Sequence, residues 1–404
     1  MAGALIAAPS PAAPQAPAPA QAPVFDAPVA EVRVAFDADG VIAVEARGVA
    51  DLAAARAVTL DDPVRVASIS KLVVALAVLR LVEDGALDLD ADVSEQLGWP
   101  LRHPRYPSAP ISLRLLLSHR SGITDGIDYV LPLDADLREA LGDGRAWDDA
   151  HPPGTFFRYA NLNLPVVAAV LERATGQRFD QLMRRLVLAP LKLDACFGWT
   201  SCEPDTVARR VVLYGDRRRP VYDRHAGATA CAVTPARDGS CDLGAWRPGR
   251  NGAIFSPQGG LRISARGLAK VGRLLLGRGQ VDGVRLLSER SIAVLESPLW
   301  TYDGTNGVTA SDVSTGPGTA GFYCSYGLGV TFLATPAEGC RDDPFGDGIR
   351  RIGHAGDAYG LRSGLWIDAA SGVGVAYFAT GIALDAPEGR SAFKRVEERL
   401  ARGE

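Results

Sequence analysis

The sequence predicts an α+β fold, in which strands from both ends of the chain form one antiparallel sheet beside a mostly helical middle region. Alternating and apolar runs separated by short turns lie near the N-terminus, at 32–46, and near the C-terminus, at 361–380. Between them, several stretches carry apolar residues at helical spacing and end at a glycine. Helices are therefore expected to flank the sheet.

The two ends of the chain contain the predicted strands. At the N-terminal end, strands at 32–36 and 41–46 surround the turn Asp37-Ala38-Asp39-Gly40, which indicates a hairpin. At the C-terminal end, 361–368 and 373–380 read as antiparallel strands joined by the turn Ala370-Ser371-Gly372. Residues 351–356 precede them and begin the same group of strands.

The predicted helices occupy most of the interval between these strands. The first follows Ser68 and ends near Gly85, where glycine interrupts the apolar pattern. Another is capped by Ser112 and ends at Gly122. Further helices are expected at 134–141, about 164–176, 179–188, 264–276, 289–295 and 390–402.

Composition and charge exclude some classes of partner. Of the 404 residues, 47% are hydrophobic and 22% are charged, as in an ordinary globular protein. The net charge of −4 leaves no basic surplus for nucleic acid. No run of 18 apolar residues occurs, so the sequence predicts no transmembrane helix. The oligomeric state is open.

The chain divides into a tail and one domain. Residues 1–27 are rich in proline and alanine and are interpreted as a tail or the remnant of a signal peptide. Residues 28–404 are expected to form the domain, with a loop-rich insertion at about 195–250.

The cysteines favour an oxidising compartment. Their even number and local spacing suit three short disulfides, with free buried thiols as the alternative. Disulfides would place the protein in the periplasm or outside the cell. The six cysteines fall as Cys196 and Cys202, Cys231 and Cys241, and Cys324 and Cys340, and the sequence leaves their pairing open.

A serine and a lysine three residues apart, Ser68 and Lys71, stand immediately before the apolar run 72–79. On a helix they would lie on one face, about one turn apart. Burial penalises the charged form of a lysine and lowers its pKa, so it can accept a proton from a nearby hydroxyl. The pair is therefore a candidate activated nucleophile. A helix cap beside a snorkelling lysine is the alternative.

The same spacing occurs again at Ser391 and Lys394, within the charged C-terminal helix that the sequence predicts. A lysine exposed on such a helix keeps its ordinary pKa and activates nothing. We therefore interpret Ser391 as part of a solvated helix face.

Two further elements carry side chains suited to a shared cleft. Tyr159 and Asn161 place a phenol and an amide two residues apart, although each alone is more often a core residue or a helix cap. His354 stands at a strand start beside Ala355 and Gly356, and the glycine would let a substrate backbone lie against the strand. A lone histidine is more often structural.

The order of these three elements resembles that of the β-lactamase-like serine hydrolases, which include class C β-lactamases, D-alanyl-D-alanine carboxypeptidases, D-aminopeptidases and esterases. The stretch 115–123, Pro153-Gly154 and Gly259-Gly260-Leu261 are also similar. The resemblance covers about residues 29–385, apart from much of 195–250. It implies the β-lactamase/transpeptidase-like fold.

The resemblance also implies roles for the residues that match it. Ser68 would form an acyl-enzyme, and Lys71 with Tyr159 would handle its proton, in an order that is debated for Ser-x-x-Lys enzymes. Asn161 would orient Lys71 and the substrate. The oxyanion hole would consist of the backbone N–H groups of Ser68 and Asp357. No metal or other cofactor is expected.

Two departures from the pattern concern the substrate. Penicillin-recognising enzymes often carry Lys-Thr-Gly at the third element, where this chain has His354, Ala355 and Gly356. A fixed cation and a hydroxyl, both useful for a substrate carboxylate, are thereby lost. Asp357 adds a negative side chain, which would favour a substrate carrying an amine unless it points away.

These observations predict a serine hydrolase that cleaves a small ester or amide, such as an esterase or a hydrolase of D-amino-acid peptides and amides. A β-lactamase or carboxypeptidase acting on β-lactams or peptidoglycan peptides is the first alternative. A binding or sensor homologue without turnover is the alternative from another class. Acyl transfer would use the same acyl-enzyme with a different attacking group. The expected partner is a small molecule or short peptide.

Overall fold

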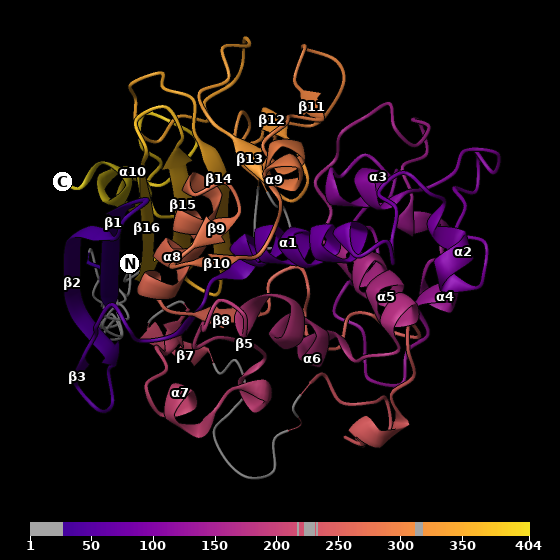
Figure 1. Cartoon of the computed structure of the whole chain (residues 1–404), viewed down its shortest axis with the longest axis horizontal. Helices are drawn as coiled ribbons and strands as arrows, with labels where there is room; N and C mark the ends of the chain where they lie inside the picture. The colour runs from indigo at the N-terminus through magenta and orange to yellow at the C-terminus, as the bar shows by residue number, and fades with distance from the viewer. Residues whose placement is uncertain (1–26, 216–217, 222–230, 232, 312–317) are drawn as a thin grey trace, which may run out of the picture.

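The computed structural model describes residues 27–215, 218–221, 231, 233–311 and 318–404. The predicted tail at 1–27 therefore lies outside the described residues, except for Ala27. Within these residues the elements form an antiparallel sheet, helices that pack on its two faces, and a mostly helical region beside it (Figure 1). The predicted α+β architecture is confirmed.

Both ends of the chain meet in the main sheet, as predicted. Strand β1 (Ala30–Asp37) pairs along its whole length with β16 (Val373–Thr380), and on its other side with β2 (Val41–Asp51). Nine strands of the described chain lie in the order β11-β12-β13-β14-β15-β16-β1-β2-β3. The others are β3 (Arg56–Ala57), β11 (Trp300–Thr301), β12 (Ser325–Tyr326), β13 (Thr331–Phe332), β14 (Ile352–Ala358) and β15 (Leu361–Asp368).

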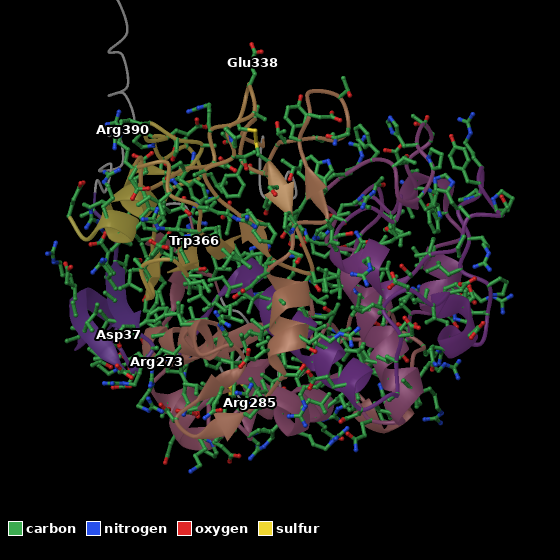
Figure 2. The ribbon with its side chains drawn as sticks, turned by 45° about the horizontal axis from the view of Figure 1, so that its top comes forward. Asp37, Arg273, Arg285, Glu338, Trp366 and Arg390 are labelled. Atoms are coloured by element: carbon green, nitrogen blue, oxygen red, sulfur yellow. A yellow bond between two sulfur atoms is a disulfide. The ribbon has the colours of Figure 1, made fainter. Side chains whose placement is uncertain are left out.

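Helices cover the sheet on both faces because alternate residues of each strand point to opposite sides. Leu365 lies on the face against α8 (Ala265–Leu276), and Trp366 on the face against α10 (Arg395–Arg402). Figure 2 shows Trp366 in the interior, whereas the charged Glu338 and Arg390 lie at the periphery. A layer of side chains therefore separates each helix from the sheet.

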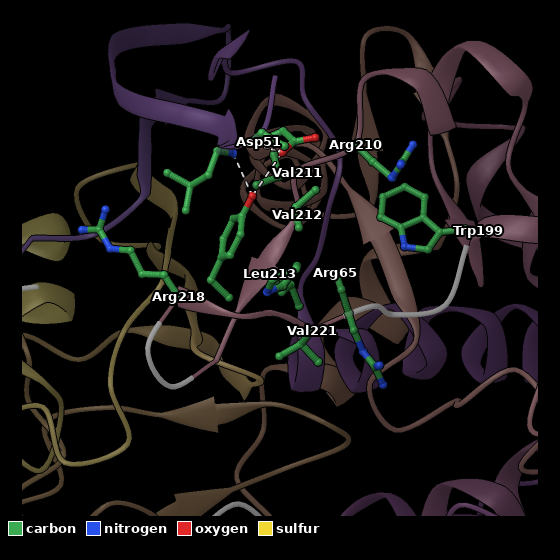
Figure 3. Close-up of a pocket in the computed structure, with 13 residues that line it drawn as sticks. Asp51, Arg65, Trp199, Arg210, Val211, Val212, Leu213, Arg218 and Val221 are labelled. Carbon is green, nitrogen blue, oxygen red and sulfur yellow. Dashed lines mark hydrogen bonds between the residues drawn. The ribbon is translucent and has the colours of Figure 1, made fainter. Parts of the chain in front are cut away.

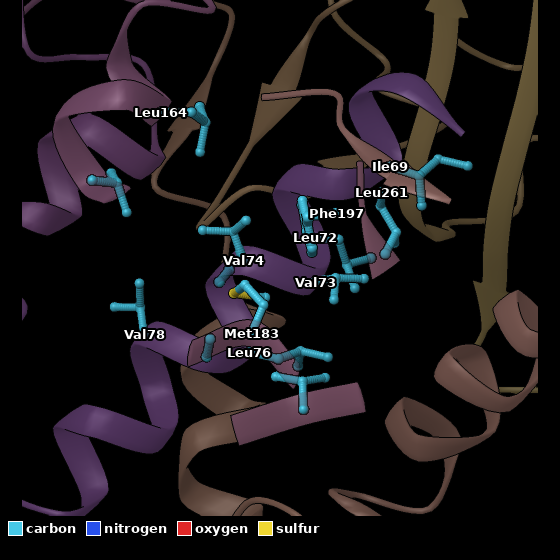
Figure 4. Close-up of a cluster of buried hydrophobic side chains, with 14 of the residues drawn as sticks. Ile69, Leu72, Val73, Val74, Leu76, Val78, Leu164, Met183, Phe197 and Leu261 are labelled. Carbon is cyan, nitrogen blue, oxygen red and sulfur yellow. The ribbon is translucent and has the colours of Figure 1, made fainter. Parts of the chain in front are cut away.

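The helix that follows Ser68 runs through the centre of the molecule (Figure 1). This helix, α1 (Ser70–Glu83), is buried from Ser70 to Leu79 on every side. Leu72, Val73 and Leu76 pack with side chains from distant segments, among them Met183 and Leu261 (Figure 4). A helix that is apolar all round belongs in a core, which explains why the run 72–79 has no polar face.

Besides α8, which lies on the sheet, the described chain has further helices, many of them in the region beside it. Three predicted helices are close to the observed ones, which are α5 (Asn163–Thr175), α8 and α9 (Glu289–Leu295). The others are α2 (Val93–Leu97), α3 (Leu113–Leu117), α4 (Leu137–Ala140), α6 (Phe179–Met183), followed by a π-turn at Arg184–Leu188, and α7 (Pro204–Ala208).

Three predicted helices are too long, and the one expected at 134–141 is reduced to α4 because the Asp136 side chain caps it at its N-terminus. The Ser112 side chain caps α3 by accepting from the backbone N–H of Leu115, as expected, but the helix ends at Leu117 because His119 adopts a φ of 54°. The C-terminal helix begins at Arg395, not at residue 390, because Lys394 is extended and its N–H bonds the Glu397 carboxylate. Ser391 thus precedes the helix, so its predicted place on a helix face is wrong.

The described part of 195–250 contains only short elements. Among them, β5 (Cys196–Phe197) joins β4 (Val64–Arg65) and β8 (Leu261–Ile263) in a small sheet. Also present are β6 (Leu213–Tyr214) and β7 (Pro220–Val221), and β9 (Gln280–Val281) pairs with β10 (Val284–Arg285) further along the chain.

All three expected disulfides are present: Cys196–Cys202, Cys231–Cys241 and Cys324–Cys340. None of the helices in the described residues has the length and apolar character that crossing a membrane requires.

Candidate active site

Ser68 lies in a single 3-10 turn, Ala67–Ile69, that leads directly into α1. The turn is fixed on both sides: the Ser70 hydroxyl donates to the Ala67 carbonyl at 2.6 Å and accepts from the Leu261 N–H at 3.0 Å. Ala67 has a φ of 47°, which costs energy for a residue with a Cβ. The surrounding bonds thus hold the serine in a conformation that the chain would not adopt alone.

Lys71 follows in the first turn of α1 and has no exposed surface. Its Nζ donates to Ser68 Oγ, Asn161 Oδ1 and the Gln258 carbonyl, each at 2.9 Å. A buried ammonium is tolerated only when hydrogen bonds replace its hydration, and these three acceptors match its three donors. The lysine is therefore held in contact with the serine and does not snorkel to solvent.

Tyr159 reaches the same serine from the other side. Its hydroxyl lies 2.8 Å from Ser68 Oγ, and its ring centroid lies 4.8 Å from Lys71 Nζ. The ring packs between Tyr323, at 4.5 Å between centroids, and His119, at 4.4 Å. These aromatic contacts fix the phenol, so Ser68 Oγ lies between an amine and a phenol that can each exchange a proton with it.

Asn161 lies with its side-chain oxygen toward Lys71, and a carboxylate that the sequence reasoning missed holds it there. Asp125 accepts from the Asn161 backbone N–H at 2.8 Å, from Asn161 Nδ2 at 3.2 Å and from the Leu162 N–H at 2.9 Å. Asp125 stands on a loop without periodic pattern, so the sequence carried no signal for this contact.

His119 is a second residue whose contacts the sequence did not predict, although it falls in the family-like stretch 115–123. Its Nδ1 accepts from the Ala160 N–H at 3.2 Å, beside Tyr159. Burial, reinforced by the nearby Lys71 charge, holds the pKa of His119 well below its usual range. The imidazole is therefore neutral, as an acceptor at Nδ1 must be.

His354 is placed differently from its predicted role. It is fully buried in β14, and its Nε2 lies 2.8 Å from the Tyr326 hydroxyl. Burial, together with the Lys71 charge, lowers its pKa to about 3, so the side chain is neutral. Strand alternation turns residue 354 inward and residue 355 toward the cleft, so His354 is not among the described residues that line it.

Gly356 lies against the Val66 carbonyl, beside the turn that carries Ser68. A Cβ at this position would lie 2.3 Å from the Val66 carbonyl oxygen and 2.3 Å from Ser363 Oγ. Ser363 Oγ in turn donates to the Val66 carbonyl at 3.1 Å. The missing side chain thus lets β14 lie against the turn that carries Ser68.

A cleft of about 260 Å³ opens beside Ser68. Ala355, Gly356 and Asp357 line one wall of it, together with Tyr323. The Asp357 carboxylate forms an ion pair with Arg362 on β15, so its negative charge is balanced by a cation in the same wall. The expected preference for an amine therefore does not follow from Asp357 alone.

The C-terminal segment also lines the cleft, with Lys394 and Glu397. Burial raises the pKa of Glu397 to about 7, although the Arg362 charge opposes the shift. Ser391 is buried nearby and bonds the Glu398 carboxylate at 2.6 Å. Lys394 of the second Ser-x-x-Lys pattern thus lines the same cleft, whereas the serine of that pattern bonds Glu398.

A separate cavity of about 410 Å³ is lined by residues from β2, β4, β6 and β7 (Figure 3). Arg65, Trp199 and Arg210 line it, with apolar residues such as Val211. Ser68 is not among its lining residues. The described residues contain no cluster of histidine, cysteine, aspartate and glutamate side chains that could hold a metal ion.

Comparison with known proteins agrees with this geometry. Esterase EstB from Burkholderia gladioli is 39% identical over 183 residues, 40% of this chain and 45% of that protein. Lovastatin esterase from Penicillium rubens is 29% identical over 38% of this chain and 44% of that protein. The match thus spans less than half the length of either relative.

Solved structures share the fold over nearly the whole chain. The class C β-lactamase from Rhodobacter sphaeroides superposes with a TM-score of 0.63 at 16% identity, covering 93% of both chains. The D-amino acid amidase from Ochrobactrum anthropi SV3 gives a TM-score of 0.61 at 20% identity, covering 93% of this chain and 92% of the other. A model of the β-lactamase family matches residues 26–395, so the chain belongs to the β-lactamase family.

Proposed function

We propose that this protein is a serine hydrolase that cleaves a small ester or amide through an acyl-enzyme on Ser68. The observation that carries the proposal is the position of Ser68 Oγ, 2.9 Å from Lys71 Nζ and 2.8 Å from the Tyr159 hydroxyl. A serine hydroxyl is a weak nucleophile at neutral pH, and adjacent proton acceptors make it reactive. The similarity to esterase EstB supports the ester class.

In the proposed first step, Ser68 Oγ attacks the substrate carbonyl carbon, and its proton passes to Lys71 as the neutral amine or to Tyr159 as the phenolate, since an ammonium or a neutral phenol could not accept it. Which of the two takes the proton stays open, because both contact the oxygen. The bond to the leaving group then breaks, and the leaving oxygen or nitrogen takes up that proton. Water attacks the resulting ester, and Ser68 regains its proton as the acid product departs.

The backbone N–H groups of Ser68 and Asp357 are proposed to bind the carbonyl oxygen as its negative charge develops. Each such donor typically contributes about 2.7 to 4 kcal/mol of transition-state stabilisation. The support for this role is the close packing of β14 on the Ser68 turn at Gly356, which brings both backbone segments to one cleft wall. Ala355 is proposed to contact the substrate in the same wall.

Hydrolysis of p-nitrophenyl esters, D-amino-acid p-nitroanilides and nitrocefin, measured in parallel, tests the proposal and separates its subclasses. We expect turnover of an ester or a D-amino-acid amide and its loss in Ser68→Ala. Efficient nitrocefin hydrolysis would instead favour the β-lactamase alternative. Wild-type activity in Ser68→Ala, with the fold intact, would overturn the proposal.

Two other outcomes are distinguished by covalent labelling of Ser68 and by product analysis. Stoichiometric labelling of Ser68 by a fluorophosphonate without turnover would favour a binding or sensor protein. Formation of an amide when an amine nucleophile is added would favour acyl transfer, which the same acyl-enzyme supports.

The proposed setting is the periplasm or the extracellular space, with residues 28–404 acting as one hydrolase domain and 195–250 as an insertion. The three disulfides support an oxidising compartment. Free-thiol titration of protein isolated from its native host should find no reactive cysteine before reduction.

A further inference from the structure

We propose that two charged residues outside the cleft, Asp125 and Arg65, are positioning residues for Lys71: Asp125 fixes the Asn161 amide, and Arg65 fixes the segment that carries the Gln258 carbonyl. The inference rests on the proposed function, because it concerns the lysine that would handle the Ser68 proton. Neither Asp125 nor Arg65 is among the described residues that line the cleft.

Asp125 sets the direction of the Asn161 amide. An amide has one oxygen and one NH₂ group, and only the oxygen can accept from Lys71. Asp125 Oδ2 accepts from Asn161 Nδ2 and from its backbone N–H, so the NH₂ group is held away from the lysine. The oxygen is thereby turned to Lys71 Nζ, 2.9 Å away.

A carboxylate is required for this task, because its two oxygens receive three N–H groups and no donor is present to repel them. In Asp125→Asn, an NH₂ group would face at least one of those N–H donors. Asn161 would relieve the repulsion by turning its amide, which would place a donor against Lys71. The substitution keeps the shape of the residue and changes only its acceptors and charge.

Arg65 acts on another acceptor of Lys71, the Gln258 carbonyl. Arg65 Nε donates to the Gly259 carbonyl at 2.8 Å, and Gly259 directly follows Gln258, whose carbonyl accepts from Lys71 at 2.9 Å. The Arg65 guanidinium also lies over the Tyr359 ring at 5.0 Å, at the edge of the cavity in Figure 3. It thus ties the 258–259 segment to the strand that leads into the Ser68 turn.

The chain provides a matched control for each substitution. Asp343, in the loop between β13 and β14, also receives three N–H groups on its two carboxylate oxygens, from Phe345, Gly346 and Gly348. Arg33 on β1 also donates from Nε to a backbone carbonyl, that of Leu400, at 2.8 Å. Asp343→Asn and Arg33→Met therefore report the structural cost of losing comparable bonds elsewhere.

The experiment measures kcat and KM for a p-nitrophenyl ester, the rate of Ser68 labelling by a fluorophosphonate, and the melting temperature. We expect Asp125→Asn to lower kcat and the labelling rate roughly 10- to 100-fold, with KM near the wild-type value. Arg65→Met should fall at the lower end of that range. Asp343→Asn and Arg33→Met should affect only the melting temperature.

Losses in Asp125→Asn and Arg65→Met no larger than those of their controls, or losses confined to KM, would overturn the inference. If Asp125→Asn does not fold, Asp125→Glu replaces it: its longer side chain should lower kcat while KM is kept, and an unchanged kcat contradicts the inference. A wild-type protein that neither turns over esters nor labels at Ser68 would instead overturn the proposed function, so the two failures are distinguishable.

Discussion

The two Ser-x-x-Lys patterns of this chain share a spacing and differ in everything around it. Ser68 and Lys71 are hydrogen-bonded to each other at 2.9 Å at the start of a buried helix. Ser391 instead bonds Glu398, and Lys394 stands in extended conformation before α10. A serine and a lysine meet only when a helical turn joins them and an apolar environment prevents the lysine from reaching water.

The largest expected difference between the two patterns is in activity. Ser68→Ala should abolish ester hydrolysis, because the proposed acyl-enzyme cannot form without Oγ. Ser391→Ala should keep kcat near the wild-type value, since its hydroxyl bonds Glu398 and not a substrate. Steady-state kinetics of both variants checks the contrast. Comparable losses in the two variants would remove the distinction between the patterns.

The next largest difference is expected between the effects of replacing the two lysines on kcat. Lys71→Ala and Tyr159→Phe are each expected to lower kcat about 10²- to 10⁴-fold, the usual range for a positioned proton-transfer group. Lys394→Ala should leave kcat near wild type, because in the described residues its ammonium lines the cleft without contacting Ser68. Single-turnover acylation resolves the step affected. A full-rate acylation in Lys71→Ala would assign its role to Tyr159 alone.

The stability of the folded protein should depend on pH through Glu397, which follows the C-terminal Ser-x-x-Lys pattern. Burial raises the pKa of Glu397 from 4.5 to about 7, so the folded protein retains this proton while the unfolded chain loses it. The free energy of unfolding should therefore fall between pH 4.5 and 7, relative to Glu397→Gln, by up to about 3 kcal/mol. Urea unfolding of both proteins across this interval measures it, and parallel curves would contradict the assignment.

The smallest expected effect is the stability contribution of Ser391. Its buried hydroxyl and backbone N–H both bond Glu398 Oε1, at 2.6 and 2.7 Å. Ser391→Ala removes one of these bonds and should lower the free energy of unfolding by about 1 to 2 kcal/mol. Urea denaturation at neutral pH tests this value. No change would mean that water replaces the hydroxyl at Glu398.

Much of the fold was predictable because the helices and strands carry strong periodic signals. The terminal strands and the helices α5, α8 and α9 follow from apolar spacing and from caps such as Ser264 and Gly176. The end of α3 at Leu117 and the start of α10 at Arg395 were not predictable, since a positive φ at His119 and a side-chain bond at Glu397 decide them. Such local contacts leave no periodic pattern in the sequence.

The candidate site was likewise predictable only in part. Ser68, Lys71, Tyr159 and Asn161 converge as their order suggested, because each stands on or beside a strongly patterned helix. The inward direction of His354 could have been derived from strand alternation, whereas Asp125 could not, because its loop contacts depend on tertiary placement.

The close approach at Gly356 has a consequence for laboratory evolution of the cleft. Any side chain there would displace β14 from the Val66 carbonyl and so disturb the serine turn itself. A mutational library aimed at new substrates should therefore leave this codon fixed. Diversity is better placed at Ser311, Thr319 and Leu384, which line the same cleft away from that junction.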